Sequence, residues 1–176
     1  PTDESNLIYR AMTEVFAAVG RFPKSGTIDQ TDRIPMTSGL GSSAACVAAG
    51  LTAANVLTGN ALSSREISDL AAKIDGHPDH VLPCLVGGAT AAVMKRDGSG
   101  VEEFIRVDLP GNLFAAALTP NFPLETKKAR KVLPEVYPKA DVVYSLSRAV
   151  VSFAALAIGD AGKLACVDDK LHQPYR

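Results

Sequence analysis

The 176-residue sequence lacks tryptophan, an absence that excludes nothing, and contains only three cysteines. Cys46, Cys84 and Cys166 are odd in number, lie far apart and form no Cys-x-x-Cys pair. Such a scattered set is not a disulfide framework. We therefore expect three reduced core cysteines in a cytoplasmic protein.

The sequence also lacks an excess of either charge. Eighteen basic and nineteen acidic residues leave a formal net charge of −1, without the basic stripe of a nucleic-acid binder. No apolar run approaches the length that spans a bilayer. The first ten residues carry Asp3, Glu4 and Asn6, unlike a signal peptide. We therefore expect neither nucleic acid nor a membrane as a partner.

What is present is an ordinary globular composition, 47% hydrophobic and 21% charged, sufficient for one domain with a real core. Apolar spacing and turn residues mark out the expected elements. They are helices over 3–19, 42–58, 64–75, 124–133, 138–158 and from 161 toward 172, and strands over 27–34, 89–95, 101–107 and 113–119. Residues 76–80 should form a polar corner. Since helices and strands do not alternate regularly, the order favours an α+β fold over a doubly wound sheet.

One stretch carries a chemical signal, namely Ile34-Pro-Met-Thr-Ser-Gly-Leu-Gly-Ser-Ser-Ala-Ala45. Gly39 and Gly41 allow a turn and a close backbone approach, and small residues with helical patterning follow. A helix that starts there offers free N–H groups and a positive dipole end to an anion such as phosphate. A hydroxyl at the loop can also reach a metal bound to the phosphates. The alternative is a plain turn with an N-cap.

Two common phosphate motifs are absent. The sequence contains no Gly-x-x-x-x-Gly-Lys-[Ser/Thr], and the loop lacks the third glycine of the dinucleotide fingerprint. The loop instead resembles the Pro-x-x-x-Gly-Leu-Gly-Ser-Ser-Ala pattern of the GHMP kinases, and the chain is most similar to their homoserine kinase family. Five further matching strings keep that family's order: Asn6–Arg10, Gly76–Asp79, Lys128–Pro134, Leu146–Ala149 and Leu171–Arg176.

The resemblance implies a two-lobed GHMP kinase fold whose first lobe is like domain 2 of ribosomal protein S5. Residues 1–108 would form most of the ATP-binding lobe, and residues 109–176 the start of the C-terminal lobe. The chain begins at Pro1, and we expect it to be an internal segment of a larger enzyme. That enzyme would use Mg-ATP to convert L-homoserine to O-phospho-L-homoserine for threonine biosynthesis, in the cytoplasm and as a homodimer.

Phosphoryl transfer needs a phosphate cradle, a divalent metal and a held acceptor. The expected ATP-binding residues are Pro35, Met36, Thr37, Ser38, Gly39, Leu40, Gly41, Ser42, Ser43, Ala44 and Ala45. For Mg²⁺, which prefers oxygen ligands, the candidates are Ser43 and Asp69. Asp69 stands eight residues before His77, where the family leads us to expect glutamate. The alternative for Asp69 is a solvated helix charge.

For the acceptor, the family resemblance points to His77 and Asp79. Arg148 is unusual in an otherwise apolar helix, so it would bind either the acceptor carboxylate or a nearby aspartate in a structural ion pair. The catalytic candidates are Asp79 and His80. Members of the family nearly always have asparagine at position 80. His80 could be a base, a sign of altered activity or, as we favour, a tolerated change.

Three alternatives stay open at this point. The enzyme could be a GHMP kinase with a different hydroxyl acceptor, an option supported by Asp69 and His80. It could be a non-catalytic relative that binds sugar or nucleotide. The segment could also be purely structural and bind nothing by itself.

Overall fold

A computed structural model describes residues 2–36, 38–118 and 132–175. The chain divides into two compact units. The first unit comprises Pro1–Met36 and Leu40–Arg106, and the second comprises Thr37–Gly39 and Val107–Arg176. The proposed lobe limits, 1–108 and 109–176, stay a prediction.

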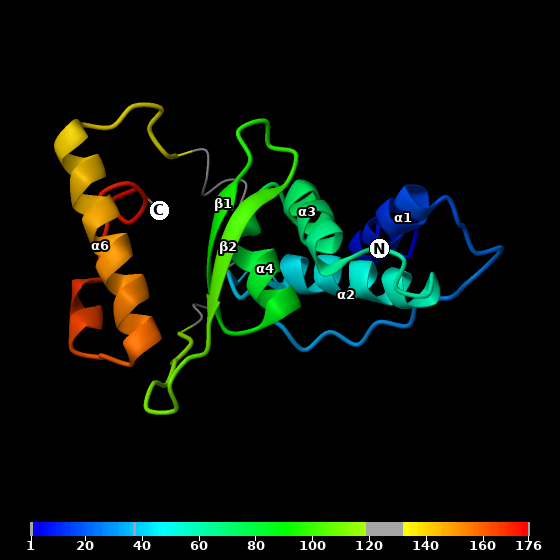
Figure 1. The fold of residues 1–176 in the computed structure, drawn as a ribbon, viewed down its shortest axis with the longest axis horizontal. Coiled ribbons are helices and arrows are strands. Elements are labelled where there is room, and N and C mark those ends of the chain that lie inside the picture. Colours follow the sequence, from blue (N-terminus) through cyan, green and yellow to red (C-terminus); the bar gives the residue numbers. More distant parts are fainter. Residues whose placement is uncertain (1, 37, 119–131, 176) are drawn as a thin grey trace. The chain divides into compact units, whose positions relative to one another are not determined.

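The first unit contains four helices and a hairpin (Figure 1). They are α1 (Leu7–Val19), α2 (Ser42–Leu57), α3 (Ser64–Asp75), α4 (Pro78–Val86), β1 (Ala89–Met94) and β2 (Val101–Val107). The two strands form one small sheet and are joined by a turn at Asp97-Gly98. This mixture confirms the α+β class.

Local signals explain the helix limits. The Asn6 side chain accepts hydrogen bonds from the N–H groups of Ile8 and Tyr9 at the start of α1. The Ser63 hydroxyl and the Glu66 carboxylate form a capping box at the start of α3. Gly20 and Gly76 end α1 and α3 with left-handed backbones at φ 68° and 78°, which glycine adopts without strain.

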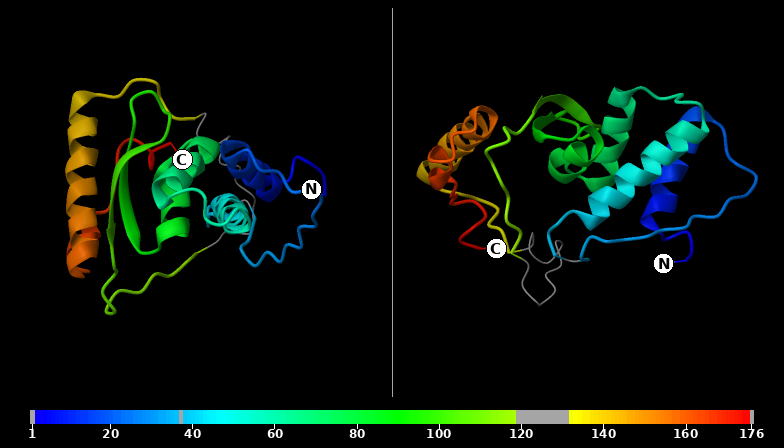
Figure 2. Two further views of the ribbon diagram at one scale, coloured as in Figure 1. Left: turned by 45° about the vertical axis from the view of Figure 1, so that its right-hand side comes forward. Right: turned by 90° about the horizontal axis from the view of Figure 1, so that it is seen from below.

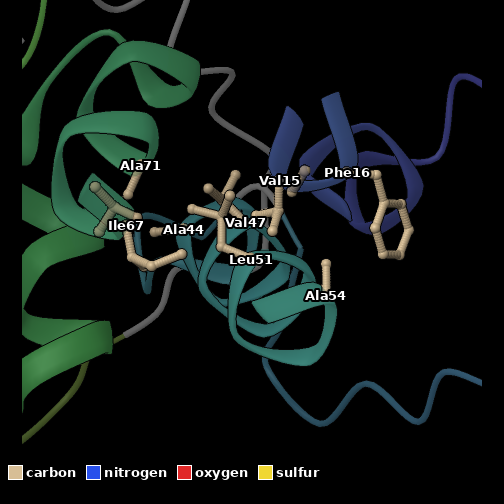
Figure 3. Close-up of a cluster of buried hydrophobic side chains, with 10 residues drawn as sticks. Val15, Phe16, Ala44, Val47, Leu51, Ala54, Ile67 and Ala71 are labelled. Atoms are coloured by element: carbon tan, nitrogen blue, oxygen red, sulfur yellow. The ribbon is translucent and has the colours of Figure 1, made fainter. Parts of the chain in front are cut away.

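Helix α2 forms the centre of this unit. Figure 3 shows Val47 and Leu51 pointing into the space between Val15 of α1 and Ile67 of α3. Both views of Figure 2 show α1 lying against α2. The approach is close because position 50 is glycine: a Cβ there would lie 2.6 Å from the carbonyl oxygen of Ile8. Small residues on α2 thus allow its neighbour to pack closely.

The second unit contains α6 (Lys139–Ile158) and the short 3₁₀ helix η1 (Lys163–Cys166). After η1 the chain returns along α6 (Figure 1). The Tyr137 hydroxyl donates to the carbonyl of Leu171 at 2.9 Å, and the Lys170 ammonium lies 3.1 Å from the Asp141 carboxylate. Polar contacts therefore hold the returning segment.

Several expected elements are wrong or shortened. Residues 27–34 and 113–118 form no strand, because no neighbouring strand among the described residues pairs with them. The last helix is reduced to η1, since the Asp169 carboxylate binds the N–H groups of Leu171 and His172. Most of the predicted basic helix, residues 124–131, lies outside the described residues.

Two further corrections concern α6 and the cysteines. By length and composition α6 could cross a membrane, contrary to our expectation that no segment approaches that length. One such helix is weak evidence, and charged Asp141 and Arg148 on α6 both form ion pairs. Cys84 and Cys166 are exposed and not in the core, whereas Cys46 is half-buried; all three are free thiols.

Candidate functional site

The glycine loop leads directly into α2. Gly39 and Gly41 both have left-handed backbones, at φ 75° and 79°, so the two glycines are required by conformation. Gly41 occupies the N-cap position, and no side chain in the described part of the chain caps the helix. The first intrahelical bond runs from the N–H of Ala45 to the carbonyl of Gly41 at 2.9 Å. The N–H groups of residues 42–44 therefore precede the helical ladder, as an anion site requires.

The other predicted ATP-binding residues differ in exposure, and so in which of their atoms a ligand can contact. Pro35, Met36 and Leu40 are exposed, and Ser38 and Ala45 are half-buried. Ala44 is buried in the core below the loop, so it can offer a ligand only its backbone. Thr37 lies outside the described residues.

The structure adds Asp32, which the sequence reasoning missed. Its carboxylate accepts a hydrogen bond from the Ser42 hydroxyl at 3.1 Å and another from the N–H of Ile34 at 2.9 Å. The Ser42 hydroxyl is thus held by the preceding segment, while the neighbouring Ser43 is exposed. Ten residues separate Asp32 from Ser42, and no local pattern connects them.

The carboxylate also affects a thiol one turn further along α2. Burial, and then the negative charge of Asp32, raise the pKa of Cys46 above its ordinary value. The side chain of Gln30 lies 3.6 Å from the sulfur and opposes this shift. Cys46 is therefore a protonated thiol at neutral pH.

The predicted polar corner is the first turn of a helix. His77 is the N-cap of α4, Pro78 follows at the first position, and Asp79 stands in the first turn. Proline suits that position because its missing N–H has no intrahelical partner there, and the aspartate faces the positive end of the dipole. His77, Asp79 and His80 are all exposed.

Asp79 and His80 form a loose pair, with 3.9 Å between Oδ2 and Nε2. The helix that carries them belongs to the first unit and packs against α2 and α3. The start of α2 at Gly41 and the turn that begins α4 are thus parts of the first unit. Their catalytic and substrate-binding roles stay predictions.

Asp69 is engaged in a structural contact. Its carboxylate accepts hydrogen bonds from the Lys95 ammonium at 2.9 Å and from the N–H of Val101 at 2.8 Å. Arg65 lies 3.8 Å away on the same helix. A Cβ on Gly100 would lie 2.5 Å from the same carboxylate. Asp69 therefore fastens the hairpin to α3, and its metal role stays a prediction.

Arg148 lies in the second unit, on α6. Its Nε donates to the Asp168 carboxylate, and its guanidinium carbon lies 3.4 Å from the centre of the Tyr144 ring. The ion pair that we considered as an alternative is therefore present. The contact of Arg148 with an acceptor carboxylate stays a prediction.

No group of three or more histidine, cysteine or acidic side chains in residues 2–36, 38–118 and 132–175 could hold a metal ion. A cavity of about 400 Å³ lies between α2, α3 and α4, lined by residues that include Asn55, Ser63 and Leu85. None of the predicted site residues lines it. The predicted magnesium site would thus need most of its ligands from phosphate and water, as Mg²⁺ accepts.

The chain is similar to known kinases over nearly all of its length. Residues 6–88 match the family described as GHMP kinases N terminal domain. The chain is 42% identical over 175 residues to a homoserine kinase of Caldicellulosiruptor saccharolyticus and 41% identical to one of Deinococcus radiodurans, covering 99% of this chain and 56% of each relative. The chain therefore spans little more than half the length of these curated relatives.

A solved structure agrees with this comparison. The crystal structure of a homoserine kinase from Cytophaga hutchinsonii superimposes with a TM-score of 0.78 at 26% identity. It covers 100% of this chain and 57% of that one. The fold expected from the resemblance is confirmed.

Proposed function

We propose that this chain is part of a GHMP kinase, because residues 6–88 match the N-terminal domain of that family, and that the full protein phosphorylates L-homoserine with Mg-ATP. The product is O-phospho-L-homoserine, a precursor for threonine synthesis. The similarity to homoserine kinases extends over 99% of the chain, beyond the GHMP domain itself. A cytoplasmic location and a homodimer stay predictions.

The observation that carries the proposal is the uncapped start of α2. Two left-handed glycines lead into a helix that no side chain among the described residues caps. Phosphate binds such a terminus through the N–H groups and the helix dipole. Because phosphoryl transfer depends mainly on positioning and charge stabilisation, this cradle is the central requirement of the reaction.

The two predicted ligands of Mg²⁺ suit that role unequally. Ser43 is exposed at the loop and is our candidate for the protein ligand, whereas Asp69 is bound to Lys95 and Val101. A bound Mg²⁺ would neutralise charge on the phosphates. The Ser42 hydroxyl is held by its hydrogen bond to Asp32. Ser43 is therefore the hydroxyl available to a ligand.

The acceptor requires groups for its ammonium and its carboxylate. We assign the ammonium or hydroxyl end to Asp79 with His77, and the carboxylate to Arg148. His80 is exposed and only loosely paired with Asp79, which supports its assignment as a tolerated change. The second candidate, a GHMP kinase with another hydroxyl acceptor, rests on this same histidine in place of the family's asparagine.

The test is ADP release by the full-length protein with Mg-ATP and one acceptor at a time. The acceptors are L-homoserine, L-serine, L-threonine, mevalonate and galactose. Turnover confined to L-homoserine supports the proposal. Turnover with another acceptor selects the second candidate, and none with any acceptor contradicts both.

Two variants separate the roles. Ser43→Ala should lower turnover and weaken the dependence on Mg²⁺, and unchanged kinetics would remove the metal assignment. His80→Asn should be nearly neutral. A loss of more than about tenfold, worth roughly 1.4 kcal/mol of barrier, would make His80 part of the mechanism.

A further inference from the structure

Residues 30–32 lie beside the first turn of α2, and two side-chain contacts within the first unit hold them there. The Ser42 hydroxyl donates to the Asp32 carboxylate at 3.1 Å, and the Gln30 amide lies 3.6 Å from the Cys46 sulfur. Two extended residues span about 6.6 Å, and four helical residues rise about 6 Å. The two contacts therefore match a segment that runs antiparallel to the start of α2.

Asp32 uses both oxygens of its carboxylate. Oδ2 accepts the bond from the Ser42 hydroxyl, and Oδ1 accepts one from the N–H of Ile34 at 2.9 Å. The bond to Ile34 spans only two residues, so it fixes the Asp32 side chain against its own backbone. The bond from Ser42 then ties the first residue of α2 to that fixed carboxylate.

This tie acts on the part of α2 that has the fewest internal bonds. The N–H groups of a first helical turn precede the hydrogen-bonded ladder, so helix ends fray. In α2 the N-cap is Gly41, whose residue type has the greatest backbone freedom, and no side chain among the described residues caps the helix. The bond between Ser42 and Asp32 is therefore a restraint on this turn that comes from outside the helix.

We propose that Asp32 is a positioning residue for the phosphate site: through the Ser42 hydroxyl it holds the first turn of α2, so that the N–H groups of residues 42–44 stay aligned for the phosphates of ATP. This inference rests on the function proposed above. Asp32 itself does not touch ATP, since a carboxylate repels phosphate. Its contribution is the restraint, because a turn that is already held loses less conformational freedom when ATP binds.

A purely structural role, in which Asp32 only attaches its segment to α2, is the main alternative. Gln30 separates the two roles, because its amide contacts Cys46, one turn beyond Ser42. Gln30→Ala loosens the same attachment and leaves the bond between Ser42 and Asp32 in place. Gln30 and Asp32 are both exposed, so replacing either one opens no cavity in the core.

The test is steady-state kinetics of the full-length protein with Mg-ATP and L-homoserine. Asp32→Ala should raise the KM for ATP about fivefold and leave the KM for L-homoserine unchanged. Asp32→Asn should stay close to wild type. The asparagine oxygen accepts the bond from Ile34, and its amide donates to the Ser42 oxygen, which can accept as well as donate.

Two matched controls accompany these variants. Gln30→Ala loosens the segment, and Asp29→Asn removes one negative charge from the same exposed stretch. Both should leave the KM for ATP unchanged.

Three kinetic results overturn the proposal. The first is a KM for ATP that Asp32→Ala leaves within about twofold of wild type. The second is an equal rise in Gln30→Ala, which would show that only the attachment of the segment matters. The third is an equal rise in Asp32→Asn, which would show that the charge of Asp32, and not its hydrogen bond, affects ATP binding.

A second readout does not require turnover. The N–H of Ala45 closes the first intrahelical bond, to the carbonyl of Gly41, and its hydrogen exchange is followed by NMR in the nucleotide-free protein. Exchange at Ala45 should be faster in Asp32→Ala than in wild type, while the amide of buried Leu51 keeps its protection. Equal exchange at Ala45 in the two proteins overturns the positioning role, whatever the activity.

The two proposals fail in different ways. A protein that binds Mg-ATP without phosphorylating L-homoserine contradicts the proposed function alone. The Kd for Mg-ATP, measured by titration calorimetry, then replaces the KM in the same set of variants, with the same expected changes. A wild-type protein that does not bind Mg-ATP overturns both proposals.

Discussion

Helices α2 and α6 are both long and largely apolar in sequence, yet they are held in opposite ways. Helix α2 buries six residues, with Leu51 and Val47 fully inaccessible. Helix α6 buries only Ser145 and Ala155 and is bound to the returning segment by hydrogen bonds and ion pairs. The difference shows that apolar composition alone does not tell how a helix is fixed.

The difference also matches the candidate roles of the two helices. The loop before α2 must keep backbone N–H groups in fixed positions, and dense packing around α2 serves that purpose. Arg148 on α6 must present a charged group, and a partly exposed polar network can orient it. Changes of side-chain volume should therefore disturb the packing of α2, whereas changes of side-chain charge should disturb the polar contacts of α6.

The largest effect should come from a cavity in α2. Leu51→Ala removes a fully buried side chain and should lower the free energy of unfolding by about 2–5 kcal/mol. Leu57→Ala in the same helix is the control, because Leu57 is 69% exposed. Denaturant unfolding of the full-length protein measures both. Equal losses would contradict the assignment of Leu51 to the core.

The opposite change of volume should be the next largest. Gly50→Ala places a methyl group 2.6 Å from the Ile8 carbonyl oxygen and 2.8 Å from the Ala11 Cβ. We expect a loss of about 1–3 kcal/mol, even though alanine favours helices by about 1 kcal/mol. Gly26→Ala, with no atom within 4 Å of the new methyl, is the control. A stabilised Gly50→Ala would mean that α1 and α2 lie further apart.

A smaller effect should follow from a charge in the first unit. Asp69→Asn weakens the bonds to Lys95 and Val101 and should cost about 1 kcal/mol, because the carboxylate is partly exposed. Lys95→Met should reproduce part of this loss, and the double variant should be less than additive. If Asp69→Asn instead changed only the Mg²⁺ dependence of turnover, the hairpin role would be wrong and the metal prediction would stand.

The smallest expected effect is a change with pH in the ion pair of Arg148 and Asp168, in the second unit. The hydrogen bond from Tyr144, and then that from Arg148, hold the pKa of Asp168 below its ordinary value of 3.8. A lowered pKa means that the contribution of the carboxylate is present above 3.8 and is lost as the pH falls through the lower, folded value. The Arg148 side-chain NMR signals should therefore stay constant from neutral pH down to about 4. A transition well above 3.8 that Asp168→Asn abolishes would contradict this.

Local patterns predicted the parts of the fold that depend on neighbouring residues. The capping box of Ser63 and Glu66, the helix after Gly41 and the hairpin turn at Asp97 were all readable, since each signal lies within a few residues. Helix α4 was missed because its first turn contains His77 and Pro78, which also suit a turn.

Contacts between distant residues could not be predicted in the same way. The strand expected at 27–34 would need a partner strand, which local periodicity cannot supply. Asp32 with Ser42, and Asp168 with Arg148, are separated by ten and twenty residues. The loop and the turn before α4 were found as motifs, and their roles in binding and catalysis stay predictions.

The most direct test of the proposed activity is ³¹P NMR of the full-length protein incubated with Mg-ATP and L-homoserine. The account predicts equal amounts of ADP and of one phosphomonoester, whose phosphorus couples to the protons of the homoserine CH₂ next to oxygen. Release of free phosphate alone would contradict it. So would ATP left unchanged with L-homoserine when a parallel sample with another acceptor yields ADP and a phosphomonoester.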